Sequence, residues 1–214
     1  MALDEALLDG ASPDSLILRF YQWAGPATTF GYSLSFAFAR KAAEEKGLAG
    51  APIVRRATGG GVVFHDGDLT FSLIFPWPRL HAPSLVYKDL HRGIHLGLKA
   101  FGVRSRLWSP PNVPAGPPLE KQCFSRAEPM DLVDEQGRKL LGGALRRRRG
   151  MGLYQGSLRP ETLACPAEDL RRGISQGLEM EWGRPPRTGL DESWLDEARR
   201  LEPKYRSDEW NRRR

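Results

Sequence analysis

Hydrophobic and polar positions follow two different periods along the chain, and these periods divide it into predicted strands and helices. In residues 69–75 every second side chain is apolar, the pattern of a half-buried strand. In residues 83–101 apolar side chains recur four apart, from Val86 to Leu98, and predict a helix with one buried face. By the same criteria, helices are predicted at residues 1–8, 37–47, 83–101, 167–178 and 190–201. Strands are predicted at residues 16–23, 28–32, 53–56, 62–65, 69–75, 130–133, 139–146 and 153–158.

Turn signals between these segments predict two hairpins. Asp66-Gly67-Asp68 separates the strands at 62–65 and 69–75, and aspartate-glycine between apolar runs is a hairpin signal. Residues 134–137 separate a second pair of strands in the same way. The mixture of elements predicts an α+β fold with a mixed, mostly antiparallel sheet flanked by helices. We expect one domain over residues 1–214, in which residues 160–214 are a candidate for a small helical cap.

Length and composition narrow the class of protein without deciding its function. The chain has 214 residues, of which 40% are hydrophobic and 27% charged, as in ordinary globular domains. No apolar run is long enough to span a bilayer, and Asp4 and Glu5 stand where a signal peptide carries positive charge. Two cysteines, Cys123 and Cys165, make no disulfide framework, so a cytoplasmic location is expected. The net charge of +6 fits either a nucleic acid or an acidic protein as partner.

The segment from Arg55 to Asp66 is a candidate ligand-binding loop. Three consecutive glycines, residues 59–61, stand between two predicted strands, although glycine loses the most backbone entropy on folding. Adjacent N–H groups of such a loop can cradle an anion, and Arg55 and Arg56 add positive charge. The spacing is that of neither a Walker A loop nor a dinucleotide-binding loop. Without a ligand, the same residues would form a wide hairpin with a glycine bulge.

The order of residues in this loop resembles the signature of a known superfamily. Residues 55–66 read Arg-Arg-Ala-Thr-Gly-Gly-Gly-Val-Val-Phe-His-Asp, which is similar to the biotin/lipoate protein ligase superfamily on its lipoate-ligase and octanoyltransferase side. Further segments resemble family motifs in the same order, at residues 1–7, 29–32, 137–144, 156–157 and 204–210. The resemblance therefore covers nearly the whole chain. It implies the class II synthetase-like α+β catalytic domain of lipoate ligases and octanoyltransferases.

The resemblance also implies a tunnel for an octanoyl or lipoyl chain. Lys139 of the family's lysine motif would lie at the tunnel mouth and stabilise the oxyanion that forms on the acyl carbonyl. His65 and Asp66 are expected to shape the pocket wall rather than to act as a base. No metal is expected, because the other histidines show no metal-ligand spacing. The residues expected to bind the acyl group or substrate are Tyr32, Arg55, Arg56, Thr58, Gly59, Gly60, Gly61, His65, Asp66, Gly142, Gly143, Ala144 and Gly156.

Cys123 distinguishes the branches of the superfamily. One group of octanoyltransferases carries Cys-Phe before the motif lysine and forms an acyl-thioester, and here Cys123-Phe124 stands sixteen residues before Lys139. Positive charge beside a thiol favours the reactive thiolate. Cys123 is therefore the expected nucleophile, and Cys165, whose spacing matches poorly, is expected to be structural. Thioester transfer requires no cofactor, because the donor is already activated.

The expected function is acyl transfer in protein lipoylation, with two alternatives. The donor would be an acyl carrier protein, and the acceptors would be lipoyl-domain proteins such as dehydrogenase E2 subunits and the glycine cleavage H protein. A run of arginines at residues 146–149 would attract their acidic surfaces, and nucleic acid is not an expected partner. The first alternative is an ATP-dependent lipoate-protein ligase, which uses ATP and Mg and an acyl-adenylate. The second is a non-catalytic acyl- or carrier-binding protein, favoured by Gly143 and Gln155, where the family usually has other residues.

Overall fold

The computed structural model describes residues 1–109, 127–160 and 163–213. Cys123 and most of the Pro- and Gly-rich stretch of sequence at residues 109–118 lie outside these ranges. None of the described helices combines the length and the apolar composition that a membrane crossing requires. The helices are α1 (Ala2–Gly10), α2 (Phe36–Glu45), α3 (Pro83–Ala100), α4 (Ala167–Trp182), α5 (Glu192–Arg206) and α6 (Asp208–Asn211). The strands are β1 (Ile17–Tyr21), β2 (Ala27–Phe30), β3 (Ile53–Arg55), β4 (Val62–His65), β5 (Leu69–Pro76), β6 (Arg106–Leu107), β7 (Leu132–Val133), β8 (Lys139–Arg148) and β9 (Met151–Leu158).

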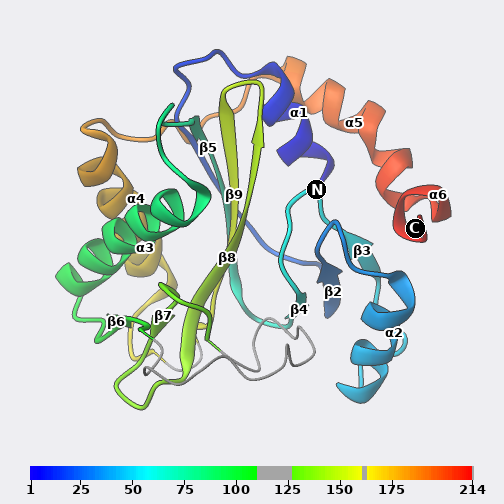
Figure 1. Cartoon of the computed structure of the whole chain (residues 1–214), viewed down its shortest axis with the longest axis horizontal. Helices are drawn as coiled ribbons and strands as arrows, with labels where there is room; N and C mark the ends of the chain where they lie inside the picture. Colours follow the sequence, from blue (N-terminus) through cyan, green and yellow to red (C-terminus); the bar gives the residue numbers. More distant parts are fainter. Residues whose placement is uncertain (110–126, 161–162, 214) are drawn as a thin grey trace.

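These strands form two sheets rather than one. The larger sheet has the order β1-β5-β9-β8-β7-β6, and all of its pairs are antiparallel. The smaller has the order β3-β2-β4, with β2 parallel to β3 and antiparallel to β4. Helices α3 and α4 cover one side of the larger sheet, while the smaller sheet and α2 lie on the other side (Figure 1). The predicted α+β class with mostly antiparallel pairing is confirmed.

The hairpin predicted at Asp66-Gly67-Asp68 is wrong, although the turn itself forms with Gly67 at φ +83°. β4 enters the smaller sheet beside β2, whereas β5 lies between β1 and β9 in the larger one. Every residue of β5 except the last is buried, so this strand needs neighbours and cover on both faces. An exposed edge hairpin with β4 could not supply them. The turn therefore carries the chain from one sheet to the other, whereas the second predicted hairpin, β7 with β8, is confirmed.

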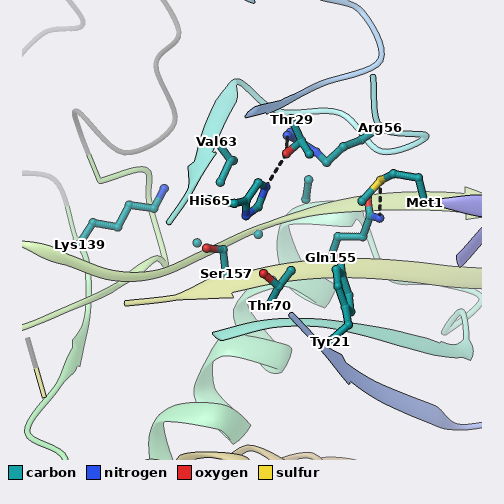
Figure 2. A pocket seen from close by; sticks show the side chains of 14 residues that line it. Met1, Tyr21, Thr29, Arg56, Val63, His65, Thr70, Lys139, Gln155 and Ser157 are labelled. Carbon is teal, nitrogen blue, oxygen red and sulfur yellow. Dashed lines mark hydrogen bonds between the residues drawn. The ribbon is translucent and has the colours of Figure 1, made fainter. Parts of the chain in front are cut away.

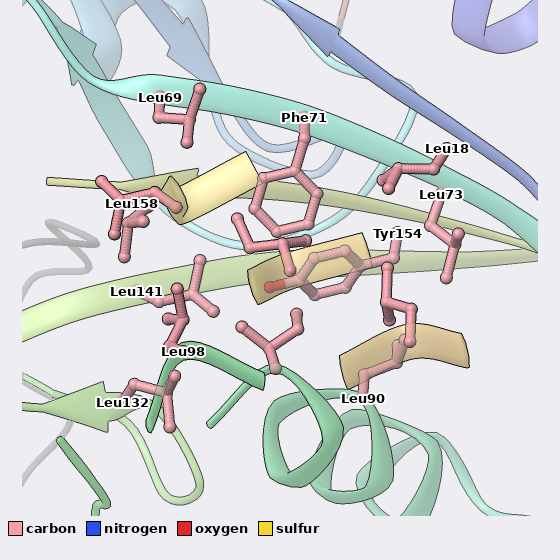
Figure 3. Packing of buried hydrophobic residues seen from close by; sticks show 14 of the residues in the cluster. Leu18, Leu69, Phe71, Leu73, Leu90, Leu98, Leu132, Leu141, Tyr154 and Leu158 are labelled. Atoms are coloured by element: carbon pink, nitrogen blue, oxygen red, sulfur yellow. The ribbon is translucent and has the colours of Figure 1, made fainter. Parts of the chain in front are cut away.

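The main core fills the space between the larger sheet and the helices α3 and α4. Figure 3 shows side chains from β5, β8 and β9 meeting those of α3, with the ring of Tyr154 at the centre. The four-residue apolar period of α3 explains this packing, because it places Leu90, Ile94 and Leu98 on the one face that meets the sheet, where all three are buried. The C-terminal helices pack in two different places: α4 contacts α3, and α5 contacts α1 (Figure 1).

Buried His91 makes the stability of this core depend on pH. Its Nε2 lies 2.8 Å from the Tyr154 hydroxyl oxygen, and its side chain has no exposed surface. Burial, together with the nearby charge of Lys139, lowers the pKa of His91 from 6.5 to about 3. Below about pH 6.5 the unfolded chain therefore binds a proton at His91 that the folded chain does not bind, and acid favours unfolding.

We predict that His91 lowers the free energy of unfolding by about 1.4 kcal/mol per pH unit as the pH falls from about 6.5 toward 3. Urea unfolding at neutral and mildly acidic pH measures this slope. His91→Gln cannot take up the proton, so its slope should be shallower than that of the wild type. Equal slopes in the two proteins would contradict the prediction.

Candidate active site

A cavity lies between the two sheets, where the crossing turn brings them together. One wall comes from β2 and β4 of the smaller sheet, and the other comes from β1, β5, β8 and β9 of the larger. Figure 2 shows Lys139 at one end of the cavity and Met1 near the other, with His65 between them. The lining residues are Met1, Tyr21, Thr29, Arg56, Val63, His65, Thr70, Lys139, Gly142, Gly143, Ala144, Gln155, Gly156 and Ser157.

Lys139, the first residue of β8, is held by a buried carboxylate. Its Nζ lies 2.7 Å from Asp131 Oδ2, and the two side chains are 6% and 0% exposed. The lysine side chain lies across Gly142, where a Cβ would overlap the lysine Cε. The absence of a side chain at Gly142 therefore leaves the space that the lysine occupies. Lys139 is a fixed positive charge at the end of the cavity.

Asp131 also connects Lys139 to the backbone of β8. The Tyr87 hydroxyl donates to Asp131 Oδ1 over 2.6 Å and accepts a hydrogen bond from the Gly143 N–H over 3.0 Å. Burial, reinforced by Asp131 and Tyr154, holds the pKa of Tyr87 well above its ordinary value, so this hydroxyl keeps its proton. The N–H of Gly143 is thus already bonded, and Lys139 lines this end of the cavity beside it.

A network of hydrogen bonds around His65 and Asp68 joins the two sheets at the cavity. His65 Nδ1 lies 2.9 Å from Asp68 Oδ2, and its Nε2 lies 2.8 Å from Thr29 Oγ1. Thr29 and His65 belong to the smaller sheet. Asp68 accepts hydrogen bonds from Thr70 and Ser157 of the larger sheet. Burial opposes ionisation of Asp68, but the bonds from these partners prevail and lower its pKa.

Gln155 connects the glycine-rich loop to the first helix. Its Oε1 accepts from Thr58 over 2.7 Å, and its Nε2 donates to Asp4 Oδ2 over 2.6 Å. Burial raises the pKa of Asp4, but the charge of Arg19 prevails and lowers it to about 2. Gln155 thus bonds two fixed partners, whereas the sequence alone shows it only as a departure from the family.

The predicted site residues divide into two groups. The cavity is lined by seven of them, Arg56, His65, Lys139, Gly142, Gly143, Ala144 and Gly156. Seven others are not among its lining residues, namely Tyr32, Arg55, Thr58, Gly59, Gly60, Gly61 and Asp66. Cys123 lies outside the described residues. Thr29, Gln155 and Ser157 also line the cavity and are not among the predicted binding residues, although Thr29 and Ser157 lie in the motif-like segments at residues 29–32 and 156–157.

Arg55 anchors the C-terminal segment instead of facing the cavity. Its Nη1 donates to the carbonyls of Tyr32 and Leu34, each over 2.6 Å, and its Nη2 donates to those of Asn211 and Arg213. The ring of Tyr32 lies against Arg213, with 3.7 Å between the guanidinium carbon and the ring centroid. Both predicted binding residues therefore hold α6 and the residues after it beside the glycine-rich loop.

Two carbonyls of the glycine-rich loop bind the side chain of Arg56. Arg56 Nη2 donates to the carbonyl oxygens of Gly59 and Gly61 over 2.9 and 3.0 Å. Gly60 has φ +85°, and a Cβ on neighbouring Gly31 would overlap the Gly60 carbonyl. The loop thus borders the cavity through Arg56. Close approach explains the glycine at position 31 and the positive φ explains Gly60, whereas a Cβ on Gly59 would meet nothing within 4 Å.

Asp66 is exposed at the crossing turn, and the acid that faces His65 is Asp68. The turn at Gly67 reverses the chain so that Asp68 returns toward the imidazole. The sequence contains both acids within one short stretch, and only the turn geometry decides between them.

The fold around this cavity is found in solved structures of lipoate ligases. Lipoate-protein ligase A bound with ATP has a TM-score of 0.77 and 22% identity, covering 98% of this chain and 91% of that one. The bi-partite lipoate protein ligase from Thermoplasma acidophilum has a TM-score of 0.75 and 21% identity, covering 98% of this chain and 89% of that one. At these identities the likeness defines the class of fold.

The chain belongs to the lipoyl protein ligase A/B catalytic domain family, whose model matches residues 1–164. The predicted family is confirmed. Octanoyltransferase LipM of Staphylococcus aureus is 30% identical, covering 98% of this chain and 92% of the relative. Octanoyltransferase LipM of Brevibacillus brevis is also 30% identical, covering 100% of this chain and 94% of the relative.

Proposed function

We propose that the protein is an octanoyltransferase of protein lipoylation that carries the acyl group as a thioester on Cys123. The observation that carries this proposal is the nearly full-length similarity to octanoyltransferases, together with a lysine fixed at one end of a cavity between the two sheets. The octanoyl group would come from an acyl carrier protein and pass to the lysine of a lipoyl domain, in the cytoplasm.

The proposed transfer has two steps, the acylation of Cys123 and the acylation of the acceptor lysine. In the first, the sulfur of Cys123 attacks the carbonyl of the donor thioester, and the carrier thiol leaves with the proton of Cys123. In the second, the amine of the acceptor lysine attacks the acyl-Cys123 thioester, the amide C–N bond forms and the C–S bond breaks. The ammonium of Lys139, held by Asp131, stabilises the oxyanion in both steps. The donor thioester supplies the activation, so ATP is not consumed.

The acidic carriers proposed as partners would meet a positively charged protein. The arginine run at residues 146–149 also serves the fold, however: Arg146 donates to the Ala57 carbonyl, and Arg148 pairs with Asp9 over 2.9 Å. Docking of an acidic carrier at this run therefore remains a prediction. Its salt dependence would reveal it, because screening weakens attraction between exposed charges.

An intact-mass experiment tests the proposed function. The protein is incubated with octanoyl-acyl carrier protein, and we expect an octanoyl adduct that hydroxylamine removes. Cys123→Ala should abolish the adduct, whereas the matched variant Cys165→Ala should retain it. Addition of a lipoyl domain should then move the octanoyl group to that domain without ATP.

Two outcomes would overturn this proposal. Acylation of the lipoyl domain that depends on ATP, without an adduct on Cys123, would identify a ligase. Carrier binding with neither an adduct nor transfer would identify a binding protein.

A further inference from the structure

We propose that a positively charged groove at the edge of the larger sheet docks an acidic face of the acceptor lipoyl domain. This inference rests on the proposed function and deepens it, because it names the surface that brings the acceptor lysine to the cavity. The groove has a volume of about 450 Å³ and lies between the end of α3, the edge strand β6 and the turn before β8. We call it the β6 groove, and its titratable residues are His95, Lys99, Arg104, Arg106 and Glu135.

The β6 groove carries a net positive charge. Glu135 lies 3.6 Å from Arg104, so it neutralises one of the three cations. Among the described residues no carboxylate pairs with Lys99 or Arg106, and both residues are exposed. His95 adds no charge at neutral pH, because burial and the nearby Lys99 lower its pKa below the ordinary value. Two exposed cations thus remain to attract an acidic surface.

The register of the strands places the β6 groove beside the reacting end of the cavity. Arg106 pairs with Val133 of β7, and Val133 pairs with Lys139 of β8. Neighbouring strands lie about 4.8 Å apart, so the backbones of Arg106 and Lys139 are about 10 Å apart across the sheet. Under the proposed function Lys139 stabilises the oxyanion, so it marks the place that the acceptor amine must reach.

The size of a protein interface decides which charges the acceptor can meet. The acceptor amine belongs to a side chain of the lipoyl domain itself, so the surface of that domain must cover the cavity end at Lys139. A standard interface buries about 800 Å² on each partner, which corresponds to a disc of about 16 Å radius. Arg106 lies within that radius, whereas Arg146 stands seven residues along β8 from Lys139, about 23 Å away and outside it. A donor that presents its thioester on a long flexible arm is not subject to this limit, so the geometry favours the acceptor.

An aromatic side chain lies between the β6 groove and the reacting end. Trp108 follows β6, and its backbone N–H donates over 2.7 Å to the carbonyl of Asp131, the acid that holds Lys139. The guanidinium of Arg106 lies over the Trp108 ring, 5.2 Å from its centroid, and Trp108 is partly exposed. Tryptophan and arginine are enriched among the residues that dominate binding energy at interfaces. This pair therefore suits the centre of the interface, and the other cations of the groove suit its charged rim.

Charge reversal in purified octanoyl-enzyme tests the β6 groove. For Lys99→Glu/Arg106→Glu, we expect the second-order rate constant of transfer to a lipoyl domain to fall about tenfold at low salt. A saturating concentration of the lipoyl domain should restore the rate, because the groove acts on encounter and binding. At about 1 M salt, where the Debye length is about 3 Å, the variant and the wild type should transfer at similar rates. Octanoyl-enzyme formation from the donor should keep the wild-type rate, which also shows that the variant is folded.

Lys41→Glu/Lys46→Glu is the matched control, because it makes the same change in net charge at two exposed lysines of α2 and its C-terminal end. Helix α2 and β6 lie on opposite sides of the molecule (Figure 1). The control should transfer at the wild-type rate. Equal slowing in both variants would show an effect of net charge and would overturn the docking surface.

Three further outcomes are decisive. Wild-type transfer by Lys99→Glu/Arg106→Glu at low salt would overturn the proposal and leave these cations as protection of an edge strand. Slower formation of the octanoyl-enzyme with unchanged transfer would assign the β6 groove to the donor, and would overturn docking of the acceptor. Failure of the wild type to form an octanoyl-enzyme would instead overturn the proposed function.

Discussion

Gly97→Ala is expected to lower the free energy of unfolding by about 3 kcal/mol, because it forces apart two helices whose backbones touch. A Cβ on Gly97 of α3 would overlap the carbonyl oxygen of Gly173 in α4 and lie 2.7 Å from the Gly177 nitrogen. These are backbone atoms, so no rotamer change relieves the overlap. Intrinsic helix propensity alone would favour alanine by about 1 kcal/mol, so the sign of the effect is itself diagnostic.

Urea unfolding of Gly97→Ala measures the loss, with Gly50→Ala as control. A Cβ on Gly50 would meet nothing within 4 Å, and its variant should stay within about 0.5 kcal/mol of the wild type. A Gly97→Ala protein as stable as the wild type would show that α3 and α4 can separate at little cost.

Asp131→Asn is expected to cost about 3 kcal/mol of stability and to slow octanoyl transfer about 100-fold. The substitution removes the carboxylate that neutralises the Lys139 ammonium, while both side chains stay buried. The amide can still accept from Tyr87, so shape and one hydrogen bond are retained. The loss should therefore come from the uncompensated charge, from a lysine that no longer keeps its position, and from the Glu128 N–H, which would face the amide NH2 instead of Oδ2.

A second variant separates the two effects. Adding Lys139→Met to Asp131→Asn removes the buried charge as well, and should recover most of the lost stability while leaving the protein inactive. Chemical denaturation and single-turnover transfer together measure both quantities. If the double variant were no more stable than Asp131→Asn, charge would not be the cause.

Local patterns in the sequence predict the elements better than they predict their partners. The four-residue period of α3 places that helix correctly, because burial of one face is a local property of the chain. The turn signal at residues 66–68 also predicts a real turn. It does not reveal that β5 prefers the centre of another sheet, because that choice depends on strands β1 and β9, the second of which is distant in sequence.

In the candidate site, too, the sequence predicts local features better than contacts between distant residues. The lysine motif correctly predicts that Lys139, Gly142 and Gly143 line the cavity, because these three residues lie close together on the single strand β8. A motif does not tell where a long side chain points, and Arg55 turns toward the C-terminal segment. The bond between Thr29 and His65 joins residues thirty-six apart, and no local signal announces it. The role of Cys123 stays a prediction.

The turn at residues 66–68 links the width of the cavity to the hydrogen bond between His65 and Asp68. Thr29 and His65 stand on one sheet, whereas the partners that fix Asp68, Thr70 and Ser157, stand on the other. Any motion that spread the two sheets to admit a long acyl chain would also stretch the bond between His65 and Asp68. The crossing turn therefore ties the spacing of the two sheets to the hydrogen bond that orients the imidazole of His65.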